Sequence, residues 1–142
     1  MNNESLESLY RKWLLDMWNG NVALAAELVT PDFVVHQARI DGQASDAMRG
    51  PEAVRQMIEQ GRASFDDLTF SIEVGPLVDG EMVSARWIGR GTYAGGAPGA
   101  TAEPGTEVVF RGIDILRVED GRFAEYWVSS DTHHLMAQLG AL

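Results

Sequence analysis

The sequence predicts an α+β fold in which helices cover one face of an antiparallel sheet. Apolar residues recur at helical spacing in the first 65 residues, they alternate at strand spacing from residue 68 onward, and two Asp-Gly pairs indicate tight hairpin turns. Helices followed by a run of antiparallel strands are typical of the α+β class. A long, curved sheet wrapped over apolar helices tends to enclose a cavity, so we also expect a small-molecule pocket.

Length and composition favour one globular domain over residues 1–142, because 45% of the residues are apolar, enough for a sizeable core. The net charge of -10 repels nucleic acid and anionic lipid surfaces, so neither is expected as a partner. The chain has no cysteine, which excludes disulfides, thiolate nucleophiles and cysteine metal ligands. It also shows no signal peptide and no membrane-spanning run of about 18 apolar residues, so we expect a cytoplasmic protein.

Three helices are expected before the sheet. The first covers residues 4–19, where one apolar stripe consists of Leu6, Leu9, Tyr10, Trp13, Leu14, Met17 and Trp18. The second covers 22–29 and ends before Pro31, since the residue before a proline avoids helical geometry. A short strand at 33–37 and a loop at 40–49 follow, and Gly50-Pro51-Glu52 opens the third helix. Its apolar stripe consists of Val54, Met57, Ile58, Gly61 and Phe65.

Two antiparallel hairpins are expected after the third helix. A half-buried strand around 68–74 turns at Asp79-Gly80 into a strand at 82–93, and strands 107–118 and 122–130 meet at Asp120-Gly121. Residues 94–106 are rich in glycine, proline and alanine, which predicts a mobile connection that either closes over the pocket or only joins strands. A short helix at 132–139 completes the chain.

Asp114 interrupts an otherwise apolar strand face. The even positions of strand 107–118 are Val108, Phe110, Gly112, Asp114, Leu116 and Val118. Strict alternation therefore points this carboxylate inward. Burial in apolar surroundings raises the pKa of a carboxyl group toward neutrality, which suits a general acid or base. The alternative is a buried ion pair with Arg86 or Arg111, since a buried carboxylate needs a partner.

Three other side chains are candidates for a site beside Asp114. Arg86 shares a strand face with Met82, Ser84 and Ile88, and either points the same way as Asp114 or forms a salt bridge at the sheet. Tyr126 lies on the strand paired with that of Asp114 and either donates a hydrogen bond to a substrate oxygen or packs in the core. His36 is either a pocket acid, base or donor, or a structural group at a strand end.

No metal site is expected. His133 and His134 are adjacent, so on a helix they point about 100° apart and cannot hold one ion together. Asp131 precedes the last helix and is first of all an N-cap. The tryptophans are interpreted as core or pocket wall, and they are Trp13, Trp18, Trp87 and Trp127.

Five strings in order resemble the SnoaL-like polyketide cyclases: "TPDFVVH", "RGPEAVRQMI", "GTYAG", "GIDILRVEDGRFAEYW" and "LMAQLG". This family belongs to the cone-shaped α+β barrel superfamily that also contains nuclear transport factor two and ketosteroid isomerase. The resemblance implies a cone with a deep apolar pocket between sheet and helices, commonly in a homodimer packed through the sheet. It also implies closure of a polyketide ring by an aldol reaction, with side-chain acid/base chemistry and neither cofactor nor metal.

The chain departs from this family at two pocket positions. The cyclases carry their pocket aspartate directly after the position of Trp127, where this chain has Val128. Their pocket histidine corresponds to Asp114. The carboxylate therefore moves to the neighbouring strand of the hairpin, within several Å of the same place.

The leading hypothesis is a cofactor-independent acid/base enzyme, of cyclase or isomerase type, that acts on a small apolar carbonyl compound. Asp114 moves a proton alpha to the carbonyl, and Tyr126, His36 or Arg86 stabilises the enolate oxygen. The expected substrate-binding residues are Arg86, Trp13, Phe110, Val128 and Trp127. The alternatives are a non-catalytic binding protein using the same pocket, an epoxide-type hydrolase with two carboxylates around an arginine, and a dimerisation module with a filled cavity.

Overall fold

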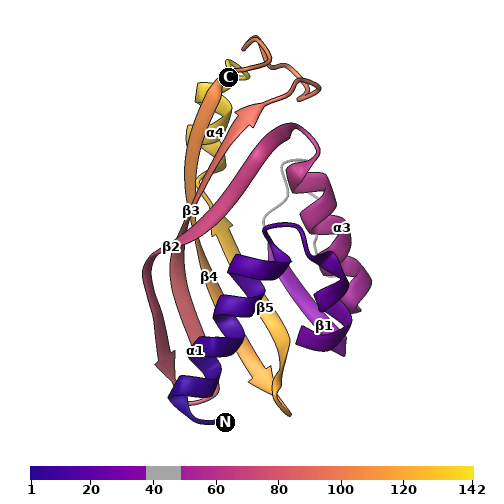
Figure 1. The fold of residues 1–142 in the computed structure, drawn as a ribbon, viewed down its shortest axis with the longest axis vertical. Coiled ribbons are helices and arrows are strands. Elements are labelled where there is room, and N and C mark those ends of the chain that lie inside the picture. The colour runs from indigo at the N-terminus through magenta and orange to yellow at the C-terminus, as the bar shows by residue number, and fades with distance from the viewer. Residues whose placement is uncertain (38–48) are drawn as a thin grey trace.

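A computed structural model describes residues 1–37 and 49–142 and confirms the α+β class (Figure 1). Most of the loop predicted at 40–49 lies outside these described residues. The helical elements are α1 (Asn3–Arg11), a π-helical turn (Lys12–Met17), a 3-10 turn (Val22–Leu24), α2 (Ala25–Leu28), α3 (Gly50–Arg62) and α4 (Thr132–Gln138). The strands are β1 (Val29–Gln37), β2 (Phe65–Asp79), β3 (Met82–Tyr93), β4 (Glu107–Glu119) and β5 (Arg122–Ser130).

The strands form one sheet in the order β1-β5-β4-β3-β2. The pair β1 and β5 is parallel, and the other neighbours are antiparallel. Both predicted Asp-Gly turns join hairpins, and Asp120 adopts a positive φ of 52° that the tight turn requires. Strands β3 and β5 have the predicted bounds, because turn residues fix them on at least one side.

Strand β1 begins at Val29, earlier than the predicted 33–37, and it includes Pro31. Proline lacks an N–H and is tolerated in a strand at the edge of a sheet, which is where β1 lies. The second helix consequently ends at Leu28, and the 22–29 segment is split into a 3-10 turn and α2.

The N-terminal helix predicted at 4–19 consists of α1 and the π-helical turn, and the side chain of Asn2 caps it by accepting from the N–H of Ser5 at 2.8 Å. In its apolar stripe, Leu9 and Trp18 are partly buried against the core, and the other five residues are buried. Phe65, assigned above to the third helix, instead opens β2, because α3 ends at Arg62.

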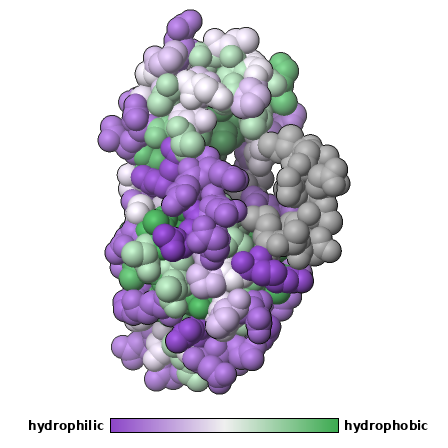
Figure 2. Space-filling model, turned by 90° about the vertical axis from the view of Figure 1, so that its right-hand side faces the viewer, coloured by the Kyte–Doolittle hydropathy of each residue, from purple (hydrophilic) through white to green (hydrophobic). Residues whose placement is uncertain are grey.

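The sheet curves around its helices. Figure 1 shows β2 bending in mid-strand, where its pairing with β3 shifts register between Ile72 and Val74 and again between Val74 and Leu77. Such bulges bend a strand and increase its twist. Helices α1 and α3 lie on one side of the sheet, and the buried apolar side chains fill the space between. The outward face of α3 is exposed and contributes to the hydrophilic middle of Figure 2.

Candidate active site

A cavity of about 780 Å³ lies between the inner face of the sheet, α3 and α4, and we call it the central cavity. Its apolar lining consists of Leu14, Trp18, Met57, Gly61, Phe65, Phe70, Trp87, Phe110, Tyr126, Val128, Leu135 and Met136. Its polar lining consists of Gln37, Gln56, Gln60, Arg62, Asp114, Ser130, Asp131 and Thr132. The volume suits a drug-sized molecule.

Asp114 is a buried carboxylate at the wall of this cavity, only 1% exposed, which confirms that it points inward. Three neutral groups donate hydrogen bonds to it. The hydroxyl of Tyr10 reaches Oδ2 at 2.9 Å, and Oδ1 accepts from the hydroxyl of Tyr126 at 2.8 Å and from Nε1 of Trp87 at 3.0 Å. Neutral donors from α1, β3 and β5 thus hold the carboxylate.

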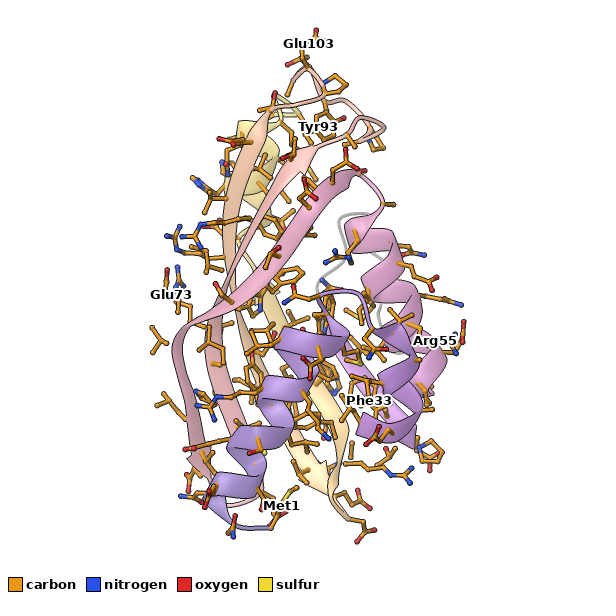
Figure 3. All side chains as sticks on the ribbon, viewed as in Figure 1. Met1, Phe33, Arg55, Glu73, Tyr93 and Glu103 are labelled. Atoms are coloured by element: carbon orange, nitrogen blue, oxygen red, sulfur yellow. The ribbon has the colours of Figure 1, made fainter. Side chains whose placement is uncertain are left out.

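The alternative that Asp114 pairs with Arg86 or Arg111 is wrong. Both guanidinium groups bind Glu73, with Nε to carboxylate distances of 2.7 and 2.8 Å, and Glu73 lies on the outer side of the sheet (Figure 3). Ala85, not Arg86, lies opposite Asp114 in the β3–β4 register. Successive residues of a strand face opposite sides, so Arg86 points away from the cavity.

Burial raises the pKa of Asp114 from 3.8 to about 6. The hydrogen bonds from Tyr126, Tyr10 and Trp87 oppose this rise because they stabilise the charged form. A weaker opposing contribution comes from the Trp13 indole, whose Nε1 forms no hydrogen bond with a described residue. Asp114 is therefore mostly ionised at neutral pH, and its pKa is close enough to 7 for the carboxylate to accept a proton.

The two tyrosines stay protonated next to this carboxylate. Burial, and then the negative charge of Asp114, raise the pKa of Tyr10 and of Tyr126 far above the ordinary phenol value. Each phenol is therefore a hydrogen-bond donor at any physiological pH.

The pairing of β4 with β5 places Asp114 directly opposite Val128. Both side chains line the central cavity, and so does Tyr126, two residues earlier on β5. The carboxylate thus lies next to the position that Val128 occupies, as the departure from the cyclase pattern predicts.

Gly112 makes room for one of the three donors. It lies opposite Trp87 in the β3–β4 register, and a Cβ at this position would overlap the indole ring. The absence of a side chain at 112 lets Trp87 lie across β4 and direct Nε1 to Asp114.

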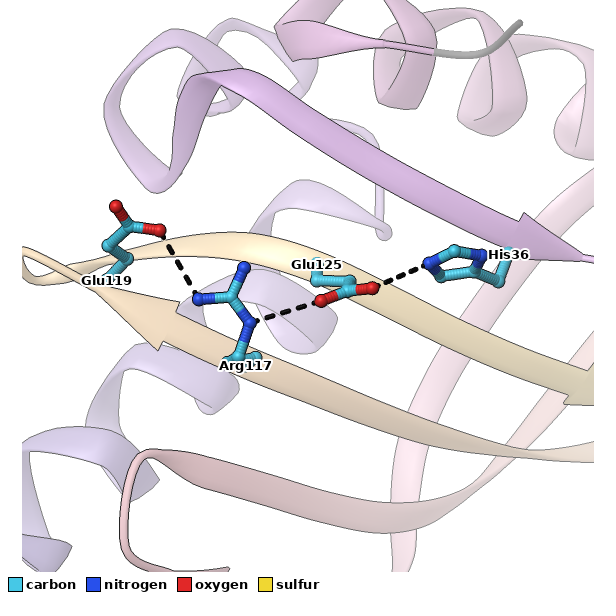
Figure 4. Close-up of polar contacts among 4 residues, drawn as sticks. All are labelled: His36, Arg117, Glu119 and Glu125. Atoms are coloured by element: carbon cyan, nitrogen blue, oxygen red, sulfur yellow. Dashed lines mark hydrogen bonds and ion pairs between the residues drawn. The ribbon is translucent and has the colours of Figure 1, made fainter. Parts of the chain in front are cut away.

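His36 and Trp127 do not line the cavity, contrary to the prediction. They lie opposite each other in the β1–β5 register on the outer face, where their rings stack at 5.2 Å. Nε2 of His36 lies 2.7 Å from Glu125, which also binds Arg117 (Figure 4). These polar contacts place His36 in a network on the outer face of the sheet.

Phe110 lines the cavity as predicted, but Trp13 does not. The indole of Trp13 is fully buried behind the cavity wall, where it meets the ring of Tyr126 edge-on at 4.9 Å. Trp13 therefore supports Tyr126 from the core.

Sequence reasoning missed the roles of Tyr10 and Arg62, and it interpreted Trp87 as core or pocket wall without its hydrogen bond to Asp114. Tyr10 was one of several apolar stripe residues of α1, and nothing in the stripe singles out its hydroxyl. Trp87 had a usable signal, because Val83, Ala85 and Trp87 form the more apolar face of β3. Arg62 is at the end of α3, where a basic residue is ordinary.

The prediction that residues 94–106 form no strand is confirmed, and none of these residues lines the cavity. The backbone N–H groups of Thr101 and Ala102 donate to the carbonyl of Leu139, each at 3.0 Å. The connection is therefore anchored to the C-terminal segment.

Asp131 caps α4, because its Oδ1 accepts from the N–H of His134 at 3.4 Å. No group of His, Asp and Glu side chains suited to a metal ion occurs among residues 1–37 and 49–142. Within the same ranges, no helix is long and apolar enough to cross a membrane.

Comparisons with known proteins point to one family. The family model of the SnoaL-like polyketide cyclases matches residues 8–139. The solved structure of TsrD from Streptomyces laurentii is 26% identical, with a TM-score of 0.80 over 100% of this chain and 99% of that chain. IdmH from Streptomyces antibioticus is 25% identical, with a TM-score of 0.79 over 97% of this chain and 99% of its own.

A SnoaL-like polyketide cyclase from Agrobacterium tumefaciens is 20% identical, with a TM-score of 0.71 over 95% of this chain and 98% of that chain, and shares the fold. No protein of curated function matches the chain.

Proposed function

Because the chain belongs to the SnoaL-like polyketide cyclase family, we propose that it is a cofactor-independent acid/base enzyme acting on a small, largely apolar carbonyl compound. Asp114 is the general base in this proposal. The observation that carries it is a buried carboxylate at the wall of a large cavity, held by three neutral donors instead of a cation. Such a group has a pKa near the working pH of a general base.

The proposed first step is removal of a proton alpha to the substrate carbonyl. The C–H bond breaks, the proton goes to a carboxylate oxygen of Asp114, and the electron pair moves into an enolate. In a cyclase the enolate carbon then attacks a second carbonyl of the same molecule, and the resulting alkoxide takes the proton back. The substrate loses one proton and regains one from the Asp114 carboxyl, which can exchange its proton with solvent in between, so no cofactor is consumed.

Tyr126 is the proposed partner for the enolate oxygen. Its hydroxyl donates to Asp114 while that group is charged, at 2.8 Å, and its side chain lines the cavity. Once Asp114 carries the substrate proton, the negative charge lies on the enolate. The hydroxyl of Tyr126 then donates its hydrogen bond to the enolate oxygen. His36 and Arg86 face outward and have no part in this step.

Exchange of 2-tetralone protons for deuterium in D2O, followed by NMR, tests this proposal because it needs no knowledge of the natural substrate. The protein should accelerate exchange next to the carbonyl, with a rate that rises with pH through about 6, and Asp114→Asn should remove the acceleration. Asp120→Asn is the matched control, since Asp120 lies exposed in the β4–β5 turn and asparagine also tolerates its positive φ. Undiminished exchange with Asp114→Asn would refute the assignment of the base.

A non-catalytic binding protein is the second candidate, and one observation favours it. The three donors occupy most of the roughly four acceptor positions of the Asp114 carboxylate. In that case 2-tetralone should bind without any accelerated exchange. The epoxide-hydrolase alternative has less support, because no arginine is among the hydrogen-bond partners that Asp114 has within the described residues.

A further inference from the structure

Arg62 contributes a guanidinium group to the lining of the central cavity. It is the last residue of α3, and its Nη1 donates to the backbone carbonyl of Trp18 at 3.0 Å. This bond fixes the guanidinium against the cavity wall and uses one of its five N–H donors. The remaining donors leave the group with capacity for a ligand.

The charge of Arg62 has no counterion within the part of the chain that the structure describes. Four other arginines, Arg55, Arg86, Arg111 and Arg117, each lie within ion-pair distance of a glutamate. Arg62 forms no such pair with a described residue, and unlike the equally unpaired Arg11, Arg90 and Arg122 it lines the cavity. Partial burial lowers the pKa of Arg62, because the cation loses hydration. No neighbouring carboxylate among the described residues offsets this loss.

An aromatic wall separates Arg62 from Asp114. Trp18, whose carbonyl holds Arg62, meets Phe70 at a ring distance of 5.8 Å, and Phe70 meets Trp87 at 5.3 Å. Trp87 in turn donates to Asp114. The positive group and the general base therefore lie at different places along an apolar surface that suits a flat, unsaturated body.

We propose that the substrate carries a carboxylate and that Arg62 binds it. The inference rests on the proposed function, because it takes the central cavity to be the reaction site. A guanidinium fork matches a carboxylate in a bidentate manner. The charged lining residues also set the orientation, because a carboxylate near Asp114, or near Asp131 at the start of α4, meets like charge, whereas a neutral carbonyl does not. The acid end thus lies at Arg62 and the reacting C–H at Asp114.

Binding of 2-naphthoate and of neutral 2-naphthamide, which share shape and differ in charge, tests this proposal by calorimetry. The wild type should prefer the acid by at least about 10-fold, and Arg62→Gln should remove the preference because it weakens naphthoate binding far more than naphthamide binding. Arg55→Gln is the matched control, because Arg55 lies on the same helix with an exposed side chain paired to Glu52. It should keep the preference for the acid.

Equal affinity of the two probes for the wild type, or a preference that survives Arg62→Gln, would overturn the proposal. Arg62→Lys keeps the charge and should retain part of the preference, which separates loss of charge from loss of the Trp18 contact. The outcomes are independent of the proton-transfer test. If only the preference fails, the exchange of 2-tetralone still depends on Asp114; if only the exchange fails, the cavity is an acid-binding site without the proposed chemistry.

Discussion

The raised pKa of Asp114 ties the stability of this fold to pH, and Asp114→Asn isolates the effect. The folded-state pKa of about 6 exceeds the model value of 3.8, so the folded protein holds this proton more tightly than the unfolded chain does. Between these two values the folded state is protonated and the unfolded state is not. Stability from this group is therefore fully present below about pH 4 and is lost as pH rises through about 6.

The size of the effect follows from the displacement of the pKa. A rise from 3.8 to about 6 corresponds to about 3 kcal/mol of unfolding free energy. The conversion is appropriate here because Asp114 is 1% exposed and solvent screens it little. Asparagine has nearly the same shape and does not titrate, so the variant lacks this pH dependence.

Urea unfolding of wild type and Asp114→Asn, followed by tryptophan fluorescence, measures the difference. The wild-type free energy of unfolding minus that of the variant should fall by about 2.5 kcal/mol between about pH 4 and pH 7.5. Surface carboxylates titrate in both proteins and cancel in the subtraction. A difference that stays constant would refute the raised pKa, and one that grows with pH would show a stabilised anion instead.

Two further predictions concern the faces of the sheet. Gly112→Ala should displace the Trp87 indole and cost about 1–3 kcal/mol of stability, measured by urea unfolding. It should also raise the pKa of Asp114 in a carboxyl-carbon NMR titration, because a donor to the anion is lost. An unchanged pKa would contradict this. We also propose a homodimer through the outer face of the sheet, where Ile113 and Ile115 are 42% and 40% exposed. Ile115→Asp should then convert the dimer into a monomer in sedimentation velocity. A monomeric wild type would rule this interface out.

The strand pattern was predictable where local chemistry fixes it. Asp79-Gly80 and Asp120-Gly121 set the turns, and alternation along β4 pointed Asp114 inward. Alternation left two readings for Arg86, an inward direction and a salt bridge at the sheet, and its ion pair with Glu73 confirms the second. Val83, Ala85 and Trp87 already made the opposite face of β3 the apolar one.

The composition of the site was harder to predict because distant segments assemble it. Tyr10 and Asp114 are 104 residues apart in sequence, and their hydrogen bond depends on how α1 packs across the curved sheet. A lone histidine such as His36 gives no sequence signal of which sheet face it occupies. The sequence therefore predicted the carboxylate and missed most of what holds it.

Charge is distributed differently on the two faces of the sheet, and this difference is the strongest argument that the inner face is functional. On the outer face, Glu73 and Glu125 are each shared between two basic groups, at distances of 2.7 to 3.1 Å. Inside, Asp114 is held by neutral donors, which leaves a carboxylate whose ionisation lowers the stability of the fold. A purely structural core gains nothing from such a group, since an apolar residue there would pack without the desolvation cost. A proton acceptor in a cavity does need this arrangement, because pairing with a cation would lower the pKa of the carboxyl group and weaken it as a base.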